Sequence, residues 1–579
     1  MGASFCASVD ERCTCSLQST IHTCRFPLWA VKVSDFLEMQ GPPRPHHLLQ
    51  EEGLLHEWFP GMFVIFTSHQ WLSSTHPDPQ GQQMEVLQKA LRGMIDGSLQ
   101  VHEDLVARST DMNLSNTIRQ HIAEGFLFFD WFAIPQITVR KDGVNEESVK
   151  SDAALAVQSI PAYVELSNVF IALVPELTHK DSSALVNYAS WLSRGWCRAE
   201  LWCRLLSNKI DTTIIVIHSP TQAEFMFPLD WQHNSIVDGD FTVESDRAIV
   251  VQLGETAVES KIQHLQVHGP LRDYRFYGAL RPKLLCQDRV DRTLQQFLED
   301  FRFSSLEQAV KDASSMNAVM CAILSGDTGM LALLAESRAD MSRPMHGLND
   351  LGFYDTQTLL MAATKSHQDP AVLTTLVELR ADPNGRASRT KLSSLYMCRS
   401  PGHVRALLEQ RAELEHSALH GAASLAGPDT LRELLKRQCD PNHILAGRQE
   451  RFGPLHAVAL FSLSNRHAVE AARLLLEHRA DVNARSAPSD EFSWECRKAR
   501  VRVAVLGFAN CNMMTRLRAS MSGISPLGYA ALVGHGQLTQ LFLDHGADPT
   551  PNDRGDTPED LARRNHHYHL IPLLATFAT

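Results

Sequence analysis

Short and almost continuous apolar runs characterise the first part of the chain. They occupy residues 63–66, 126–129, 169–174 and 213–217. Segments with helical character lie between them, at roughly 82–94, 150–164 and 197–208. Continuous rather than alternating apolar runs are typical of strands that are covered on both faces, as in parallel sheets. The alternation of strands and helices over residues 56–220 therefore predicts an α/β domain with an open parallel sheet.

The flanking segments have weaker patterns. Residues 1–55 contain four cysteines and the turn-rich segment 41–45, and we expect an irregular leader there. Residues 221–305 are mixed, with helices expected near 245–267 and 289–301, so this region is interpreted as a helical extension or linker.

From about residue 316 the chain becomes repetitive. One motif has a Leu pair, a few polar residues, and then Ala-Asp, usually followed by Pro-Asn or Val-Asn. Its copies and weaker variants lie at 333–340, 379–384, 407–413, 434–442, 475–483 and 543–549. A second motif, with a small Ala pair, lies between these copies, at 358–363, 417–423, 453–459 and 525–531. This alternation predicts a row of helix pairs, because Ser or Thr caps a helix, Pro fits its first turn and the Leu pair buries the second helix.

The two alternating motifs resemble ankyrin repeats, whose period is about 33 residues. The resemblance implies an all-α ankyrin solenoid over residues 316–579, with six or seven repeats. It also implies that the solenoid binds a protein partner through its concave face and projecting turns.

The sequence departs from the ankyrin pattern in two ways. Where that family prefers Gly before Ala-Asp, this chain has arginine, at Arg338, Arg380, Arg411 and Arg479. If this position is left-handed, each Arg costs about 1 kcal/mol relative to Gly. In addition, the segment 487–520 carries no clean motif and contains a basic stretch over 497–518, so we expect either a degenerate repeat or an inserted basic loop.

Three motifs of the first part have the order and spacing of a known domain. They are Phe63–His69, a strand that ends in Ser-His; Phe128–Gln136, a strand that ends in Asp130; and Gly195–Leu201, with Trp-Cys-x-x-Glu-Leu. In this order they resemble the three boxes of the TIR (Toll/interleukin-1 receptor) domain. The resemblance implies a TIR-like, flavodoxin-like sheet over 56–220 that acts in signalling or self-association.

Some TIR domains hydrolyse NAD, and their catalytic glutamate matches Glu200. The resemblance then implies cleavage of the nicotinamide–ribose bond, in which a carboxylate stabilises an oxocarbenium-like transition state. Ser68 and Asp130 lie at predicted strand ends, where open α/β sheets bind their ligands. The aromatic residues expected to contact NAD are Trp131, Phe132 and Trp196. The alternative is that Glu200 is simply an acidic residue near a helix N-terminus.

Composition narrows the classes of protein. The 579 residues are 44% apolar and 21% charged, which excludes a disordered, collagen-like or coiled-coil chain. The net charge of −12 argues against a nucleic-acid binder. No apolar run approaches the ~18 residues of a membrane helix, and the N-terminus lacks a secretory pattern. We therefore expect a cytoplasmic protein without a membrane span.

Resident cofactors and metals are not expected. The cysteines at 13, 15 and 24 with His22 match no zinc-finger spacing. His69 and His76 flank a Pro-rich turn, where a role in shaping the loop is expected rather than catalysis. Two hypotheses remain: a protein-binding scaffold or signalling protein without enzymatic activity, and an NAD hydrolase that the repeats regulate.

Overall fold

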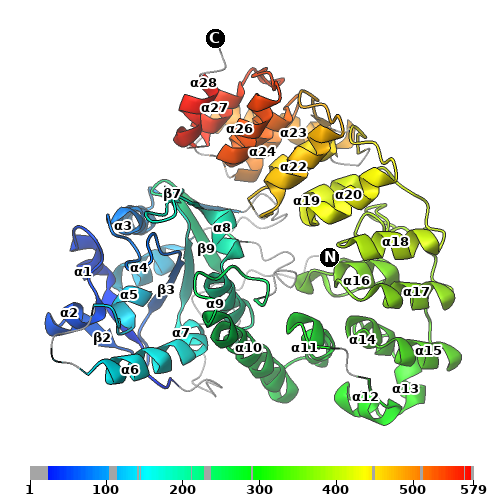
Figure 1. Ribbon diagram of the computed structural model, residues 1–579, viewed down its shortest axis with the longest axis horizontal. Helices are drawn as coiled ribbons and strands as arrows, with labels where there is room; N and C mark the ends of the chain where they lie inside the picture. Colours follow the sequence, from blue (N-terminus) through cyan, green and yellow to red (C-terminus); the bar gives the residue numbers. More distant parts are fainter. Residues whose placement is uncertain are drawn as a thin grey trace. The chain divides into compact units, whose positions relative to one another are not determined.

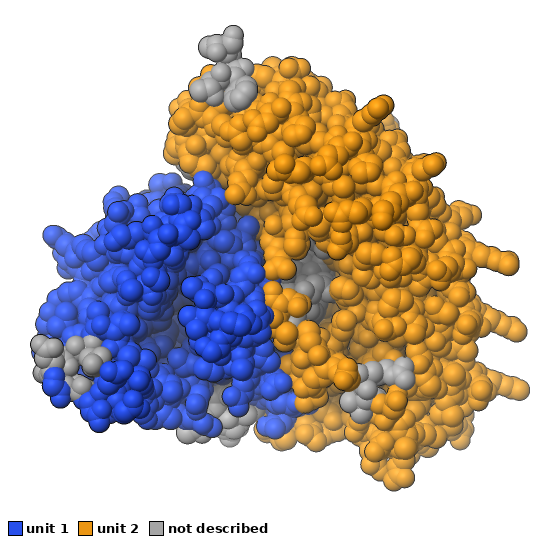
Figure 2. Space-filling view, viewed as in Figure 1, with its two compact units in different colours: residues 1–228, 239–264 blue, residues 229–238, 265–579 orange. Residues whose placement is uncertain are grey.

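The computed structural model describes residues 24–103, 114–139, 143, 145–209, 212–226, 236–288, 291–445, 450–463, 465–488, 490–508, 511, 513–565 and 567–575. The chain forms two compact units, coloured separately in Figure 2. Residues 1–228 and 239–264 form the first, here named the sheet unit; residues 229–238 and 265–579 form the second, the repeat unit. No helix in the described part of the chain is both long and apolar enough to cross a membrane.

An eight-stranded sheet forms the centre of the sheet unit (Figure 1). Its spatial order is β2 (Leu55–Glu57), β1 (Trp29–Lys32), β5 (Phe126–Phe129), β3 (Val64–His69), β6 (Val169–Leu173), β9 (Ile214–Ser219), β10 (Gln222–Phe225) and β4 (Val101–Glu103). The four strands β5, β3, β6 and β9 run parallel to one another. They include the four apolar runs of the sequence, so the prediction of a parallel α/β sheet is confirmed for the centre. The pairings of β1 with β2 and β5, and of β10 with β9, are antiparallel, so the complete sheet is mixed.

The register of the central strands explains why their sequences are almost uniformly apolar. Phe66 of β3 lies opposite Phe128 of β5 and Phe170 of β6. The rings of Phe66 and Phe128 stack with centroids 4.5 Å apart, and those of Phe66 and Phe170 with centroids 5.3 Å apart. All three side chains are no more than 1% exposed. Stacked aromatic rings across neighbouring strands bury a large area and fix the pairing of the strands.

Helices cover both faces of this sheet. They are α1 (Val33–Glu38), α2 (His46–Glu51), α3 (Gln82–Asp96), α4 (Asn116–Glu124), α5 (Asp130–Ala133), α6 (Glu146–Gln158), α7 (Ile160–Leu166), α8 (Tyr188–Ser193) and α9 (Gly195–Leu205), with a small hairpin of β7 (Leu177–Thr178) and β8 (Leu185–Val186). Ile65 and Ile171 pack in one core with Leu87 and Leu91 of α3. The neighbouring Phe66 belongs to the opposite face, because side chains alternate along a strand.

Two boundaries differ from the sequence-based expectation. The prediction of an irregular leader over 1–55 does not describe residues 24–55, because β1 extends the sheet through hydrogen bonds to β5 and β2. Residues 1–23, with three of the four leader cysteines, lie outside the described residues. The expected extension 221–305 also divides, since β10 pairs with β9 in the sheet unit whereas the helices from residue 265 onward belong to the repeat unit.

The two helices expected in this extension are present. They correspond to α10 (Asp246–His268) and α12 (Leu294–Asp300), and α11 (Leu271–Leu284) and α13 (Leu306–Lys311) accompany them. Arg275 of α11 is buried, and it donates to Asp312 at 2.8 Å and to the Phe301 carbonyl at 2.7 Å. These bonds join α11 to the segment that leads into the repeats.

Helix pairs follow one another from α14 to the C-terminus (Figure 1). They are α14 (Ala318–Leu324) with α15 (Thr328–Glu336), α16 (Leu359–Lys365) with α17 (Pro370–Glu378), α18 (Pro401–Glu409) after a non-helical segment, α19 (Ala418–Leu425) with α20 (Pro428–Lys436), α21 (Pro454–Leu460) with α22 (Ala468–Glu477), α25 (Pro526–Val533) with α26 (Gly536–Asp544), and α27 (Pro558–Arg564) with α28 (Ile571–Ala575). Thr358 and Ser525 cap α16 and α25, and Pro526 occupies the first turn of α25, as the sequence predicts.

An asparagine in the turn after several helix pairs links one repeat to the next. Asn442 donates to the Arg479 carbonyl at 2.9 Å and accepts from the Asp481 N–H at 2.7 Å. Asn483 makes the same pair of bonds to the Gly546 carbonyl and the Asp548 N–H, at 3.1 and 2.8 Å. We name this arrangement the asparagine brace. It satisfies two backbone groups of the following repeat with one side chain.

The brace also explains the irregular segment 487–520. Asn483 reaches Asp548 across 65 residues, whereas Asn442 reaches Asp481 across 39. Helices α21 and α22 pack directly on α25 and α26. The intervening residues form α23 (Asp490–Leu506) and α24 (Met513–Ser520), which pack on each other. The segment is therefore inserted between two consecutive repeats, as one of the two expectations has it, but it forms a helical hairpin and not a loop.

The arginines that replace Gly adopt the left-handed conformation, one of the possibilities considered for this position from the sequence. Their φ angles are 67° at Arg338, 73° at Arg380, 65° at Arg411 and 66° at Arg479. Gly546 has a φ of 79° at the equivalent place after α26. Each of these residues follows the C-cap of a second helix, where a left-handed residue ends the helix and satisfies its last carbonyl groups.

Candidate functional site

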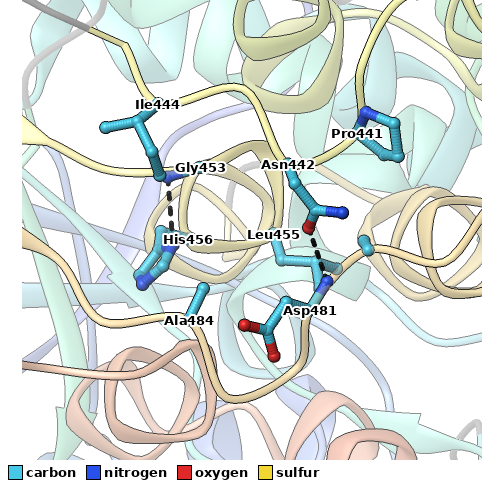
Figure 3. Close-up of a pocket in the computed structure, with 9 residues that line it drawn as sticks. Pro441, Asn442, Ile444, Gly453, Leu455, His456, Asp481 and Ala484 are labelled. Carbon is cyan, nitrogen blue, oxygen red and sulfur yellow. Dashed lines mark hydrogen bonds between the residues drawn. The ribbon is translucent and has the colours of Figure 1, made fainter.

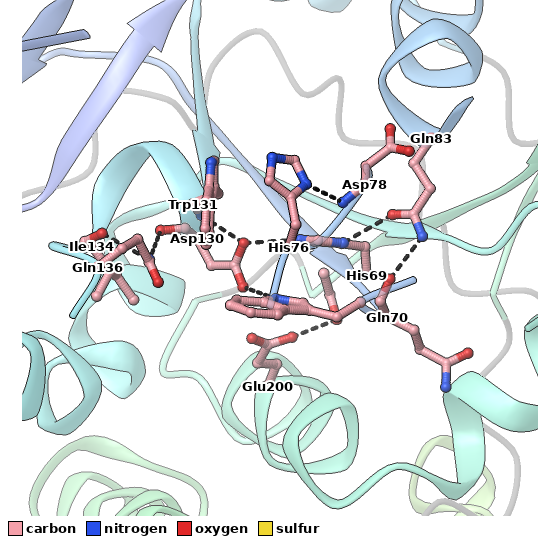
Figure 4. Close-up of polar contacts among 12 residues, drawn as sticks. His69, Gln70, His76, Asp78, Gln83, Asp130, Trp131, Ile134, Gln136 and Glu200 are labelled. Atoms are coloured by element: carbon pink, nitrogen blue, oxygen red, sulfur yellow. Dashed lines mark hydrogen bonds and ion pairs between the residues drawn. The ribbon is translucent and has the colours of Figure 1, made fainter. Parts of the chain in front are cut away.

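Two polar networks meet at the carboxyl end of β3 (Figure 4). Ser68 and His69 are the last residues of this strand, and successive side chains of a strand point to opposite faces. Ser68 contacts Glu200 of α9, whereas His69 contacts Gln83 of α3 and Asp130 at the start of α5. The strand end therefore brings together polar groups from helices on both faces of the sheet.

The first network fixes the hydroxyl group of Ser68. Its Oγ donates to Glu200 Oε2 at 2.5 Å and accepts from Trp191 Nε1 at 3.0 Å. Burial raises the pKa of Glu200 to about 8, although the Ser68 hydrogen bond acts in the opposite direction. At neutral pH Glu200 is therefore largely protonated, and it becomes a carboxylate above about pH 8.

The second network holds a buried ion pair. His69 Nε2 lies 2.9 Å from Asp130 Oδ1, and His69 Nδ1 lies 2.9 Å from Gln83 Oε1. Gln83 Nε2 donates to the Gln70 carbonyl, so Gln83 Oε1 must accept and both His69 nitrogens carry hydrogen. The His69 side chain is 2% exposed and the Asp130 side chain 30%.

The charges of this pair stabilise each other. Burial alone lowers the pKa of His69, but the charge and hydrogen bond of Asp130 raise it above its ordinary value. Burial alone raises the pKa of Asp130, but His69 and the Trp71 indole, which donates at 2.8 Å, lower it below its ordinary value. Asp130 is therefore an anion at neutral pH, and the pairing favours the cationic form of His69.

The site thus contains two carboxyl groups in different protonation states, a protonated Glu200 and an ionised Asp130. Environments that separate the pKa values of neighbouring acids are typical of acid–base sites. Cys197 also lies here and donates to the His69 carbonyl at 3.6 Å. Burial raises its pKa well above the ordinary value, so it remains a thiol and is not an activated nucleophile.

The structure brings together Ser68, Asp130 and Glu200 at this strand end. Trp131 lies beside them, since its backbone N–H donates to Asp130 Oδ1 at 2.6 Å and its ring packs against Trp71. Trp131 and Phe132 are 1% and 0% exposed within the core, so we assign them no stacking role. Trp196 is partly exposed, but its Nε1 donates to Asp246 at 3.1 Å, outside both networks.

Sequence reasoning missed four residues of the site: His69, Trp71, Gln83 and Trp191. The expectation that His69 shapes a loop is wrong, because it is the last residue of β3 and pairs with Asp130. The Ser-His pair at the strand end was the available signal, since strand ends of open α/β sheets carry ligand-binding groups. Gln83 and Trp191 gave no such signal, because their role depends on how α3 and α8 pack.

The repeat unit holds a cavity of about 300 Å³ between α21 and the turns beside it (Figure 3). Ile444 and Leu455 supply apolar lining, and Asn442, His456 and Asp481 supply polar groups. His456 Nδ1 accepts from the Gly453 N–H at 3.1 Å. Burial lowers the pKa of His456 to about 4, so the ring is neutral at pH 7. The polar groups here stabilise the repeats and form no acid–base pair.

Within the residues that the structure describes, no group of three or more His, Cys, Asp or Glu side chains is arranged to bind a metal ion.

Comparisons with known proteins concern the repeat unit. Residues 452–487 match the ankyrin repeat family. Among solved structures, the chain is similar to the ankyrin repeat domain of Bcl-3, a member of the IkappaB protein family (22% identity, 43% of this chain and 97% of that chain, TM-score 0.28). It is also similar to the ankyrin repeat domain of human ASB11 (19% identity, 44% of this chain and 96% of that chain, TM-score 0.30). No curated protein matches the sequence significantly. The C-terminal region of the chain thus carries ankyrin repeats, the family to which residues 452–487 belong.

Proposed function

We propose that the chain is a protein-binding scaffold whose ankyrin repeats recognise a partner. The observation that carries this proposal is the array of helix pairs joined by the asparagine brace, together with the ankyrin match at 452–487. Stacked repeats form one extended surface, since each repeat buries its apolar face on its neighbours. The turns between helix pairs carry exposed side chains suited to specific contacts, among them His346, Arg389 and Ile444.

Affinity capture with the full chain tests this proposal. The turn variant combines His346→Glu, Arg389→Glu and Ile444→Glu; the matched control combines Glu378→Lys, Lys436→Glu and Glu477→Lys, at exposed ends of second helices. We expect at least one co-purifying protein to fall ~10-fold with the turn variant, a difference of about 1.4 kcal/mol, and to be retained by the control. Identical sets of captured proteins for the wild type and both variants would contradict the proposal.

A second function, hydrolysis of NAD by a TIR-like sheet unit, is favoured by one observation. Ser68, Asp130 and Glu200 lie together at the carboxyl end of β3. The order of the parallel strands, β5-β3-β6-β9, equals second-first-third-fourth along the chain, which is typical of flavodoxin-like sheets. Such sheets bind ligands at the strand ends where the order reverses, here between β3 and β6.

In this function a carboxylate beside the ribose stabilises the positive charge that develops as the bond to nicotinamide breaks. Asp130 is already ionised, whereas Glu200 gains its charge only near pH 8. If Glu200 is the catalytic carboxylate, turnover rises with pH up to about 8 and levels off above it. If Asp130 is the carboxylate, this rise is absent.

Incubation of the full chain with NAD decides the question. The wild type is compared with Glu200→Gln, which keeps a hydrogen-bonding side chain beside Ser68 but cannot ionise. We expect nicotinamide release to fall at least ~100-fold in the variant, the size of effect found when a stabilising group is removed from a transition state. Equal release by both proteins, or none from the wild type, would remove this function.

A further inference from the structure

The inserted hairpin of α23 and α24 carries a surface that the repeat array does not explain. Four apolar side chains of α23 are exposed: Trp494 by 56%, Val501 by 63%, Val505 by 75% and Leu506 by 46%. The inward face holds Ala499 and Val503, which pack with Cys511 and Ala519. An amphipathic surface helix ordinarily carries apolar residues on its inward face and polar residues on the opposite one. Helix α23 thus carries apolar residues on both faces, and those on the outward face indicate a binding role.

Three of the outward apolar residues form one line. Trp494, Val501 and Val505 are spaced by seven and four residues, which places them within about 40° of one another around the helix. An i, i+7, i+11 line of anchors is typical of helices that insert one face into an apolar groove. Single exposed apolar residues are common on protein surfaces, whereas several on one helix face are typical of interaction sites.

Basic residues flank this apolar line on both sides. Arg497 lies on one side, and Lys498 and Arg502 lie on the other; all three are exposed. Lys498 Nζ sits 3.0 Å from the centroid of the Trp494 ring, a cation–π contact that orders both side chains. The segment 490–520 carries six basic and three acidic residues in a chain whose net charge is −12. The hairpin is thus a local positive region on an acidic protein.

We propose that this face of α23 docks into an acidic helix-binding groove of a partner protein. Trp494, Val501 and Val505 fill the groove, and Arg497, Lys498 and Arg502 meet acidic residues at its rim. Complementary charge at the rim speeds association and selects among partners. This surface is separate from the repeat turns of the proposed function, so either proposal can fail while the other stands.

The same chemistry argues against two other occupants. A second copy of the chain would bring the basic flanks of two α23 helices together, and like charges across an interface are unfavourable. A helix that lies on an anionic membrane uses a broad apolar face rich in Trp, Phe and Leu. The apolar line of α23 spans only about 40° and two of its three members are valine.

Binding of the full chain to calcium-loaded calmodulin tests the proposal, because calmodulin is an acidic protein with methionine-rich apolar grooves that open with calcium. We expect calcium-dependent binding by isothermal titration calorimetry, weakened at least ~10-fold (about 1.4 kcal/mol) by the double substitution Val501→Glu, Val505→Glu. Arg497→Glu with Lys498→Glu is expected to weaken binding and its dependence on salt. The control Arg473→Glu, on an exposed position of α22, is expected to bind as the wild type does.

Circular dichroism during heating checks that each variant is folded, and if the glutamate variant is not, Trp494→Ala with Val501→Ser replaces it. Absence of calcium-dependent binding, or binding that these substitutions leave unchanged, would overturn the proposal. So would association with vesicles of 30% phosphatidylserine, lost with the same substitutions, in the absence of calmodulin binding.

Discussion

The candidate site of the sheet unit and the repeats hold their buried histidines in different charge states. In the repeat unit, buried histidines are neutral, because burial lowers the pKa of His420 and His456 to about 4, and His420 Nε2 lies 2.8 Å from the Phe452 carbonyl. In the sheet unit, His69 is held charged against Asp130 at one strand end. In the repeats, His420 and His456 therefore act as neutral hydrogen-bonding groups. At the end of β3 a charged pair lies beside a second carboxyl group, an arrangement that is typical of functional sites.

The largest loss of stability confined to one unit is expected from substitutions in the hydrophobic cores. Leu475 of α22 is 0% exposed, so Leu475→Ala should lower the free energy of unfolding of the repeat unit by about 3 kcal/mol. The paired variant Ile171→Ala, in β6, should act on the sheet unit by a similar amount. Hydrogen exchange followed by mass spectrometry reports each unit separately. Equal loss of protection in both units from either substitution would show that they unfold as one.

The ion pair at β3 gives the next largest effect. Asp130→Asn leaves the His69 imidazolium buried without its partner, so we expect a loss of about 2 kcal/mol by urea unfolding. This loss depends on pH. Because the pKa of His69 is raised in the folded state, its contribution to the free energy of unfolding is complete below its unfolded pKa of about 6.5. This contribution is progressively lost as the pH rises through the folded pKa.

Because the pKa of Asp130 is lowered in the folded state, this residue contributes to the free energy of unfolding above its unfolded pKa of about 3.9. The contribution is lost as the pH falls through the folded pKa. The difference in the free energy of unfolding between the wild type and Asp130→Asn is therefore greatest between about pH 4 and pH 6.5. If this difference in stability stays constant from pH 5 to pH 10, the pair is not ionic. Gln136→Ala, outside the ion pair, serves as the control.

The asparagine brace is expected to have a smaller effect. Asn483→Ala removes two hydrogen bonds to the following repeat, and these are exposed, so we expect a loss of about 1 kcal/mol. Asn442→Ala removes the equivalent pair and should cost a similar amount. If Asn483→Ala leaves the free energy of unfolding unchanged while Asn442→Ala lowers it, the inserted hairpin rather than the brace holds together the two repeats on either side of the hairpin. Thermal unfolding of both variants makes the comparison.

The left-handed arginines give the smallest effect, and it has the opposite sign. Arg479→Gly removes the strain of a φ of 66° and should stabilise the repeat unit by up to about 1 kcal/mol. The reverse substitution, Gly546→Arg, should destabilise it by a similar amount, since the φ of Gly546 is 79°. A loss of stability from Arg479→Gly would show that the arginine side chain makes a stabilising contact that outweighs its backbone strain.

Sequence patterns predicted much of the fold, because the features concerned are local. The four apolar runs became β5, β3, β6 and β9, and the Leu-Leu and Ala pairs became the two helices of the repeats. The motif also marked the positions before Ala-Asp where Arg replaces Gly, but their left-handed conformation was established only by the structure. The strand β1, which lies between β2 and β5, was missed because four residues are too few to show a distinct period.

By itself the sequence determined the periodic elements, since the period of apolar residues reflects which face of a helix or strand is buried. Tertiary structure decided the candidate site. Ser68 and Glu200 are 132 positions apart in the chain, and they meet only because α9 packs on β3. It also decided that 487–520 is an inserted hairpin, because the packing of α21 and α22 on α25 and α26 and the bond from Asp548 to Asn483 show which repeats are neighbours. Such contacts depend on strand order and helix packing, which no local pattern encodes.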